Sequence, residues 1–354
     1  MAETMMSYIE QESAVLGAIT HKYPQSLAPL AEWLAQRQVN RVLILATGSS
    51  LNAALCARYY FETRFGILVE IKEPWSFCHY ERLDPTTDLV LAITQSGKSA
   101  STIAAIDKVQ RAGTPAFCLT SDPQSPAAQA AQAVLDIGTG IETVGFVTRG
   151  FSATVLNLLL IALLIAQKQQ LMTAQQTAAE LREIQTLAAA LPAIIAQTER
   201  FFIRHQKLLA EHARFVAVGY GALLGVAKEF ETKFTETVRQ PSSGFELEAY
   251  MHGPYLEAND DHVMFFIDSD HHPRLQALRD YMRPAVAAAF MVTMGPDNGD
   301  EQTLALDLAV QHHFAPLALI VPFQILAWRT AGLKGIDLSV RIFDDFDRVL
   351  KSKI

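Results

Sequence analysis

The chain has 354 residues, of which 50% are apolar and 19% are charged, and this composition is typical of a globular protein with a large core. The formal net charge of −8 disfavours nucleic acid and anionic membranes as partners, although local donors can still bind a small anion. Cys56, Cys78 and Cys118 show no paired metal spacing, which predicts reduced thiols in a cytoplasmic protein. Residues 1–12 are acidic and lack the apolar core of a signal peptide.

Apolar runs typical of buried strands recur along the chain in two sets. The first set lies at residues 41–48, 67–73, 88–97, 114–122 and 133–140. The second set lies at residues 214–221, 261–270, 288–296 and 304–310. Because these runs are continuously apolar and alternate with helical stretches, they predict parallel sheets that are covered on both faces. We therefore predict an α/β fold with two doubly wound, flavodoxin-like domains.

A constant offset of 173 residues relates the two sets, which indicates an internal repeat. The offset joins three pairs: Gly48 with Gly221, Asp88 with Asp261, and Phe117 with Phe290. The repeat sets the expected boundaries: an N-terminal helical segment 1–24, a first domain 25–168, a helical linker 169–205, a second domain 206–338 and a C-terminal tail 339–354.

Residues 151–167 form an apolar segment that is nearly long enough to span a bilayer, and no second such segment is evident. Its first two turns carry Ser152, Thr154 and Asn157. We therefore predict a buried core helix or a subunit contact here, and no membrane partner.

Two loops at strand ends share one composition, a bend-forming glycine beside hydroxyl side chains. "ATGSSLNAAL" places Gly48, Ser49 and Ser50 after the first strand. "TQSGKSAST" places Thr94, Gln95, Ser96, Gly97 and Ser99 after the third strand. In doubly wound sheets ligands bind beyond the carboxyl ends of the strands, and a helix N-terminus favours an anion. Hydroxyl donors that converge from two such loops predict a phosphate site.

A simpler interpretation makes Ser49 and Ser96 ordinary helix N-caps. The repeat offers a comparison, because the second copy reads "IDSD" where the first has Thr94–Gly97. Asp268 and Asp270 would repel a phosphate, so only the first copy is predicted to bind one. Lys98 either adds charge to that site or is solvated.

The motifs "ATGSSLNAAL", "ITQSGKSAST" and "MHGP" resemble the sugar isomerase (SIS) domain family. Over residues 25–340 the chain is similar to the isomerase half of glucosamine-6-phosphate synthase and to fructosamine-6-phosphate deglycases. The resemblance implies that the two loops hold the 6-phosphate of a sugar. It implies that Glu236 moves a proton between C1 and C2, with Lys233 and Glu229 at family positions. It also implies that His252 assists ring opening from the neighbouring subunit of a homodimer.

Glu229, Lys233 and Glu236 are spaced four and three residues apart, which places them on one helix face. That helix begins at the mouth of the second sheet, where we expect the substrate. A carboxylate that takes and returns a proton, with an imidazole as a second acid or base, suits carbon-acid chemistry on a sugar. Lys233 would stabilise the enediolate. The alternatives are a solvated charged face for the helix and a simple turn at His252.

No metal and no cofactor are expected. "DSDHHP" with Asp268, Asp270, His271 and His272 is a local cluster without a second set of ligands, and His312 with His313 is similar. The glycine at residue 48 does not open a dinucleotide fingerprint, because the third glycine is missing.

The chain departs from the family pattern at three places. No amidotransferase domain with an N-terminal cysteine precedes the first loop, so we expect no glutaminase activity. Val147 replaces an expected serine, and the C-terminal proline–arginine pair and catalytic lysine are missing, which leaves Lys351 or Lys353 as substitutes. We therefore predict a deglycase or a ketose/aldose isomerase acting on a 6-phosphorylated ketosamine or amino sugar. A non-catalytic sugar-phosphate sensor and a lyase acting on an ether-linked sugar acid remain as alternatives.

Overall fold

The computed structural model describes residues 3–354, which divide into two compact units. The first-sheet unit comprises Val15–Gln185 and Arg341–Ile354. The second-sheet unit comprises residues 3–14 and Thr186–Val340. The division falls inside the long helix α8 (Ala174–Glu211), and α1 (Met5–His21) also contributes residues to both units.

The first-sheet unit is built on five parallel strands in the order β2-β1-β3-β4-β5. Their bounds are β1 Arg41–Leu45, β2 Leu68–Lys72, β3 Leu89–Ile93, β4 Ala116–Thr120 and β5 Ala133–Asp136. The central strands β3 and β4 are buried along their whole length, as their continuous apolar sequences predict. The five predicted runs of the first set therefore all contain strands, each two to five residues shorter than predicted.

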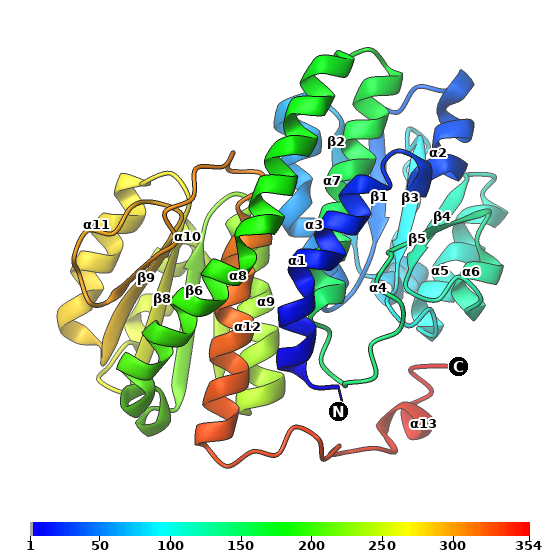
Figure 1. Ribbon diagram of the computed structural model, residues 1–354. Coiled ribbons are helices and arrows are strands. Elements are labelled where there is room, and N and C mark those ends of the chain that lie inside the picture. The colour runs from blue at the N-terminus through cyan, green and yellow to red at the C-terminus, as the bar shows by residue number, and fades with distance from the viewer. Residues whose placement is uncertain (1–2) are drawn as a thin grey trace. The chain divides into compact units, whose positions relative to one another are not determined.

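Helices cover both faces of the first sheet (Figure 1). α4 (Pro74–Tyr80), α5 (Ala100–Arg111) and α6 (Pro126–Ala130) pack on one face, over side chains such as Leu43, Val90 and Cys118. The remaining long helices of the unit are α3 (Ser49–Tyr59), which continues into the π-helical turn η3 (Tyr60–Arg64), and α7 (Arg149–Lys168). Short helices complete the unit: η1 Gln25–Leu27, α2 Ala28–Trp33, η2 Leu34–Gln36 and α13 Phe346–Leu350.

The second-sheet unit repeats this topology. Its five parallel strands have the order β10-β9-β8-β6-β7. The bounds are β6 Arg214–Gly219, β7 Ser242–Glu246, β8 His262–Asp268, β9 Ala288–Thr293 and β10 Thr303–Ala305. Written from β7, the order matches that of the first sheet strand for strand, which confirms the predicted repeat and the doubly wound fold.

Two strands of the second sheet differ from the sequence prediction. β7 was missed, because "SSGFE" is polar, short and lies at the sheet edge, where apolar patterning is weakest. The predicted run 304–310 was too long, since only Thr303–Ala305 pairs with β9. β10 is the other edge strand of the sheet. The rest of the predicted run, residues 306–310, lies in the loop that follows it.

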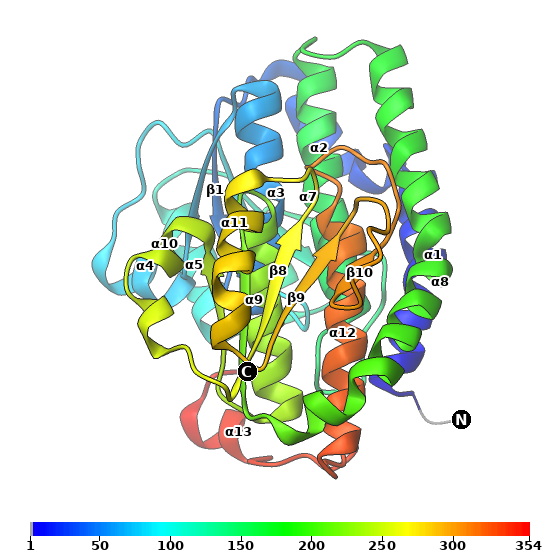
Figure 2. The same ribbon diagram turned by 90° about the vertical axis from the view of Figure 1, so that its left-hand side faces the viewer.

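The second sheet is also covered on both faces by helices, and the two faces are covered by different segments of the chain (Figure 2). α10 (Leu247–Met251) and α11 (Pro273–Met282) pack over Val216, Met264 and Phe266. α9 (Leu223–Lys233), its π-helical extension η4 (Phe234–Val238) and α12 (Pro316–Leu333) cover the opposite face, where Phe230 and Phe323 contact Phe265. Two short turns complete the unit: η5 Pro254–Glu257 and η6 Arg283–Ala285.

One repeated hydrogen bond shows how closely the two copies correspond. Asp88, before β3, accepts from the backbone N–H of Asn40 (2.7 Å), and Asp261, before β8, accepts from that of Ala213 (3.2 Å). Donor and acceptor are both displaced by 173 residues. The aspartate pair noted in the sequence therefore joins the starts of two neighbouring strands in each copy.

Two helices are long and apolar enough to cross a membrane, so the sequence prediction of a single such segment was wrong. In α7, 94% of the apolar window is buried inside the protein, and in α12 the share is 78%. Burial of this extent is typical of core helices, and it accounts for the polar residues of α7, since Asn157 donates to the carbonyls of Ile137 and Ala153.

At Gly97, both the backbone conformation and the surrounding space require glycine. Its φ is +65°, and an added Cβ would lie 1.9 Å from Ser125 Oγ. Gly113 also has a positive φ, +81°, but a Cβ there would meet nothing within 4 Å. A side chain at Gly113 would therefore cause backbone strain alone, whereas a side chain at Gly97 would cause both backbone strain and steric overlap.

We expect Gly97→Ala to lower the free energy of unfolding by about 2 kcal/mol more than Gly113→Ala, because only the first substitution adds overlap to strain. Chemical denaturation of both variants measures the difference. Equal losses would show that Ser125 moves aside without cost.

Candidate functional site

The predicted phosphate loops lie at the switch point of the first sheet. β1 and β3 are neighbouring parallel strands, with Leu45 opposite Ala92. Gly48–Ser50 follows β1 and Thr94–Ser99 follows β3, so both loops leave the same edge of the sheet, from strands about 4.8 Å apart. The chain then leads to β2 on one side and to β4 on the other, which opens a crevice between the two loops.

The serines are not simple N-caps in the way the alternative interpretation supposed. Gly48 occupies the N-cap position of α3, with φ +57° and no side-chain cap, and Ser49 and Ser50 are the first residues of the helix. At α5 the N-cap is Ser99, whose Oγ accepts from the backbone N–H of Thr102 at 3.4 Å. Ser96 stands three residues earlier, where its Oγ accepts from the Lys98 N–H.

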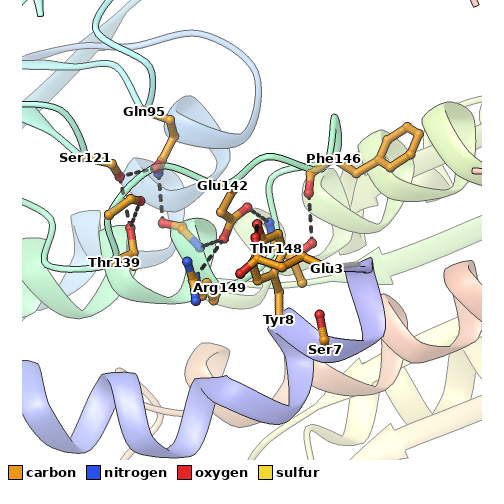
Figure 3. Close-up of polar contacts among 12 residues, drawn as sticks. Glu3, Ser7, Tyr8, Gln95, Ser121, Thr139, Glu142, Phe146, Thr148 and Arg149 are labelled. Carbon is orange, nitrogen blue, oxygen red and sulfur yellow. Dashed lines mark hydrogen bonds and ion pairs between the residues drawn. The ribbon is translucent and has the colours of Figure 1, made fainter. Parts of the chain in front are cut away.

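Gln95 points its amide into the protein (Figure 3). Its Nε2 donates to the Gly150 carbonyl at 2.8 Å and to Thr154 Oγ1 at 2.6 Å, while its Oε1 accepts from Ser121 Oγ at 3.0 Å. Ser121 in turn bonds to Thr139 at 3.0 Å. The side chain of Gln95 therefore anchors the loop to α7.

Glu142 holds the segment that precedes α7, also shown in Figure 3. Its two carboxylate oxygens accept from the backbone N–H groups of Thr148 (2.9 Å) and Gly150 (2.8 Å). A carboxylate at this position satisfies helix N-terminal donors and interacts favourably with the helix dipole. Because the Gly150 carbonyl receives Gln95, Glu142 indirectly supports the loop after β3. Sequence analysis missed this role, since nothing in the residue pattern pairs 142 with 150.

The C-terminal residues pair with the loop after β3. Lys353 forms an antiparallel bridge with Ser99, the Ala100 N–H donates to the Ser352 carbonyl at 3.1 Å, and the Ile354 N–H donates to that of Lys98 at 3.0 Å. The Lys353 ammonium lies 2.7 Å from Asp347. The tail thus reaches the predicted site by its backbone, while the charge of Lys353 is paired within the tail and Lys351 lies at its exposed C-cap.

Glu229, Lys233 and Glu236 share one face, as their spacing predicts, and they form a single ion cluster. Lys233 Nζ lies 3.3 Å from Glu229 Oε1 and 2.8 Å from Glu236 Oε2. The side chains of Glu229 and Lys233 are fully buried, whereas that of Glu236 is 42% exposed. The alternative of a solvated charged face is therefore wrong.

Burial alone would lower the pKa of the Lys233 ammonium, but the two carboxylates outweigh it and raise the pKa above its usual value. Lys233 is consequently charged at any physiological pH. It holds one oxygen of Glu236 at a fixed point and leaves that carboxylate partly open to a ligand.

The cluster does not lie at the mouth of the second sheet, where the sequence argument placed it. Lys233 ends α9 and Glu236 lies in the π-helical turn η4, which leads directly to the start of β7. A helix that connects parallel strands runs antiparallel to them, so these residues lie toward the amino ends of the strands. The error came from locating the helix by its start alone.

The π-helical turn belongs to the repeat. η3 follows α3 as η4 follows α9, and Glu62 and Glu236 are each the third residue of their turn, although the 173-residue offset itself pairs Glu236 with Thr63. Glu62 accepts from Arg58 Nε (3.0 Å) and from the Val69 N–H (3.2 Å), both within its own unit. A π-turn is common at functional sites, but here both copies have one, and only the second places a buried lysine against its glutamate.

His252 does not meet Glu236 within the second-sheet unit. It follows α10, whose Tyr250 contacts Met264, whereas α9 and η4 pack over Phe265. Neighbouring residues of a strand point to opposite faces of the sheet, so the two helices cover opposite faces. His252 is exposed at the C-cap of α10, and Glu236 lies on the other side of the sheet.

The repeat identifies a counterpart of His252 that sequence analysis overlooked. Residue 79 precedes 252 by 173, and His79 lies in α4 after β2 as His252 follows α10 after β7. His79 stacks on Trp75 at a centroid distance of 4.4 Å and bonds to its carbonyl. Applying the offset to His252 would have found it.

The histidine and aspartate loop at the mouth of the second sheet forms no metal site. Within residues 3–354 no group of three or more His, Cys, Asp or Glu side chains is arranged to hold a metal ion. Asp268 instead accepts from Tyr220 at 2.8 Å, and His312 bonds to Ser269.

Burial raises the pKa of Cys118 to about 12, so this thiol is unreactive.

Comparison with known proteins identifies the fold family. The SIS domain family model matches residues 34–167. Residues 34–167 form a SIS domain. The second-sheet unit repeats the strand order of this SIS domain, so the chain carries two SIS-like sheets.

Among curated proteins, the glutamine–fructose-6-phosphate aminotransferase (isomerizing) of Zymomonas mobilis is 27% identical over 309 residues. That match covers 85% of this chain and 50% of the relative, so the chain spans about half the length of the curated relatives it matches.

Solved structures agree with this two-sheet SIS fold. A protein of Clostridium difficile 630, provisionally assigned as a phosphosugar isomerase, superposes with a TM-score of 0.91 at 21% identity, and the match covers 99% of this chain and 98% of that one. The C-terminal domain of glucosamine-fructose-6-phosphate aminotransferase from Francisella tularensis superposes with a TM-score of 0.83 at 18% identity, covering 94% and 96%. At these identities the likeness shows the fold alone.

We expect Lys233→Met to destabilise the protein by about 3 to 5 kcal/mol, because it removes the buried cation that balances the charge of the Glu229 carboxylate. Denaturant unfolding of Lys233→Met and of the double variant Glu229→Leu/Lys233→Met measures this. The double variant should recover most of the loss. If the single and double variants lost the same free energy of unfolding, the cause would be the lost packing of the Lys233 side chain and not the uncompensated charge of the Glu229 carboxylate.

Proposed function

We propose that this SIS protein is an enzyme that binds a 6-phosphorylated ketosamine or amino sugar and transfers a proton between neighbouring carbons. One observation carries the proposal: two hydroxyl-bearing loops follow adjacent strands at the switch point of the first sheet, and each leads into a helix. Ser49, Ser50, Ser96 and Ser99, with the backbone around Gly48 and Gly97, are positioned to surround a tetrahedral anion. The curated relatives support a sugar substrate, since their names specify fructose 6-phosphate.

Glu236 acts as the base in this proposal. It takes a proton from C1 or C2 of the open-chain sugar, forming an enediol or enediolamine, and returns the proton to the other carbon. The Lys233 ammonium, 2.8 Å from Glu236 Oε2, stabilises the negative charge that develops on the sugar oxygen. Glu229 balances Lys233 from its buried side.

The same proton transfer leads to two outcomes. With a ketosamine, moving the proton from C1 to C2 forms an imine at C1, and addition of water then releases the amine, which is deglycation. With a ketose, the transfer yields the aldose, which is isomerisation. We favour deglycation, because a reaction that starts from a ketosamine needs no source of ammonia. We propose that the protein acts in the cytoplasm.

A homodimer completes the site. Glu236 and His252 cover opposite faces of one sheet, so a single chain does not bring them together within its second-sheet unit. An exposed histidine next to a turn is free to reach a neighbouring molecule. We therefore assign His252, as the group that assists ring opening, to the site of the partner subunit.

We expect Glu236→Gln to reduce turnover of a fructosamine 6-phosphate by about 10² to 10⁴, because the amide cannot accept the proton. The matched control is Glu62→Gln, which alters the same π-turn in the other copy and should leave turnover near the wild-type value. Released amine and altered sugar are both measured, over a panel of 6-phosphorylated ketosamines, amino sugars and hexoses.

Two results would contradict this assignment. Near wild-type turnover in Glu236→Gln would exclude Glu236 as the base. Calorimetric binding of the sugar phosphates by the wild-type protein, with no turnover of any of them, would instead identify a sensor.

A second prediction concerns the shared site. We expect Glu236→Gln and His252→Asn homodimers to be inactive, and an equal, re-equilibrated mixture to regain about a quarter of wild-type activity, because each heterodimer contains one intact site. Activity of the mixture is compared with that of each variant alone. No recovery in a mixture shown by mass spectrometry to contain heterodimers would place both residues in the same subunit's site.

A further inference from the structure

The mouth of the second sheet is occupied by the protein's own side chains. Tyr220, after β6, donates its hydroxyl to Asp268 at 2.8 Å and also bonds to Asp270. The backbone N–H of Ser269 bonds back to the Tyr220 oxygen at 3.3 Å. His312 stacks on Tyr220 with ring planes 19° apart. None of these five residues takes part in the proposed reaction.

His312 joins the two loops of this mouth. Its Nε2 accepts from the backbone N–H of Ala222, just before α9, at 3.3 Å. Its Nδ1 lies 2.6 Å from Ser269 Oγ, after β8. Because Nε2 accepts, the proton of the neutral ring is on Nδ1, which donates to Ser269. The imidazole is therefore not a base for Ser269, and the pair does not form an activated nucleophile.

The repeat shows what this position corresponds to. With the offset of 173 residues, Ser269 matches Ser96 and Ala222 matches Ser49. In the first copy these are the two loops between which we propose the sugar phosphate binds. In the second copy the imidazole bridges the equivalent points, as a permanent internal ligand of the helix N-terminus.

The His312 ring leaves no room for a side chain at residue 221. Gly221 has φ +51°, and an added Cβ would lie 2.8 Å from His312 Nε2. The corresponding Gly48 has φ +57°, but a Cβ there would meet nothing within 4 Å. The first mouth is thus open at the glycine, and the second is closed by the ring.

We propose that His312 is a positioning residue, which fixes the N-terminus of α9 and thereby the placement of Lys233 and Glu236 at its other end. The catalytic part of this inference rests on the proposed function. α9 has 11 residues and a length of about 16 Å, so a shift at its start moves its end as a rigid rod. A misplacement of about 1 Å is enough to reduce catalysis substantially.

The contact depends on the charge of the ring. Burial lowers the pKa of His312 below its usual value, and His272 lowers it further, while Asp270 and Asp268 oppose this. The other titratable groups that face the ring are Tyr220, after β6, and the adjacent His313. The neutral ring stabilises the native state above the unfolded pKa near 6.5, and this contribution is lost as the pH falls through the lower native pKa. A protonated ring cannot accept from Ala222.

The test compares His312→Phe, which keeps a ring but has no acceptor, with His312→Gln, whose Oε1 can accept from Ala222. His271→Asn is the control, since His271 is exposed in the neighbouring loop and its φ of +56° suits asparagine. Hydrogen–deuterium exchange is measured over residues 222–238. Steady-state kinetics with the active 6-phosphorylated substrate are measured from pH 5 to 8.

We expect His312→Phe to accelerate exchange about tenfold at residues 222–226 and also at the η4 turn. Its kcat should fall at least about tenfold with KM within about threefold, because the phosphate loops belong to the other sheet. His312→Gln should restore exchange and kcat, and its kcat should lack the decline at acid pH that we expect protonation of His312 to cause in the wild type. His271→Asn should behave as the wild type in every measurement.

Unchanged exchange in His312→Phe would overturn the inference, and so would acceleration confined to residues 222–226 with an unchanged kcat. Failure of His312→Gln to rescue would show that ring packing, not the hydrogen bond, is what matters. If the wild-type protein turns over no substrate of the panel, the proposed function fails. The exchange at η4 then still decides whether His312 fixes the far end of α9.

Discussion

Parallel strands place all their carboxyl ends at one edge of a sheet, and this constraint organises the protein. At the switch point of each sheet, two loops lead into helices. The first backbone N–H groups of such helices have no acceptor within the helix itself. Those groups need an acceptor. In the first sheet they are flanked by hydroxyl side chains on an open turn, and in the second they receive His312. In the second copy the protein's own imidazole supplies the acceptor, and in the first copy we propose that a bound phosphate supplies it.

This difference explains how a duplicated unit supports two roles. We propose that the copy with the open mouth binds an anion. In the copy with the closed mouth, the proposed catalytic groups lie at the opposite end of α9. Lys233 shows why that end is specialised. A fully buried ammonium is tolerated only because two carboxylates compensate its charge, and one of them, Glu236, remains partly exposed. The first copy has Glu62 in the same turn but no such buried cation.

Glu236 and His252 lie on opposite faces of the second sheet, and this separation is the reason for proposing a homodimer. The π-turn carries a carboxylate whose proposed partner lies across the sheet. In the proposed homodimer, a second copy of the chain supplies this group without any change to the sheet itself. The loops of the first sheet are independently stabilised, since Gln95 is anchored to α7 and Glu142 caps that helix.

The sequence by itself determined the repeat, the parallel α/β class and the loops at the switch point. These features depend on local periodicity, on glycine at positive φ and on a constant offset, all of which are visible along the chain. It also placed Glu229, Lys233 and Glu236 on one face, because helical spacing is a local property. Only the tertiary structure decided that two of these side chains are buried, that they lie away from the sheet mouth, and that Gln95 points inward. It also revealed β7 and the contact of His312 with Ala222, 90 residues earlier in the chain. Burial and long-range hydrogen bonds depend on how distant segments pack, and no pattern of neighbouring residues records that.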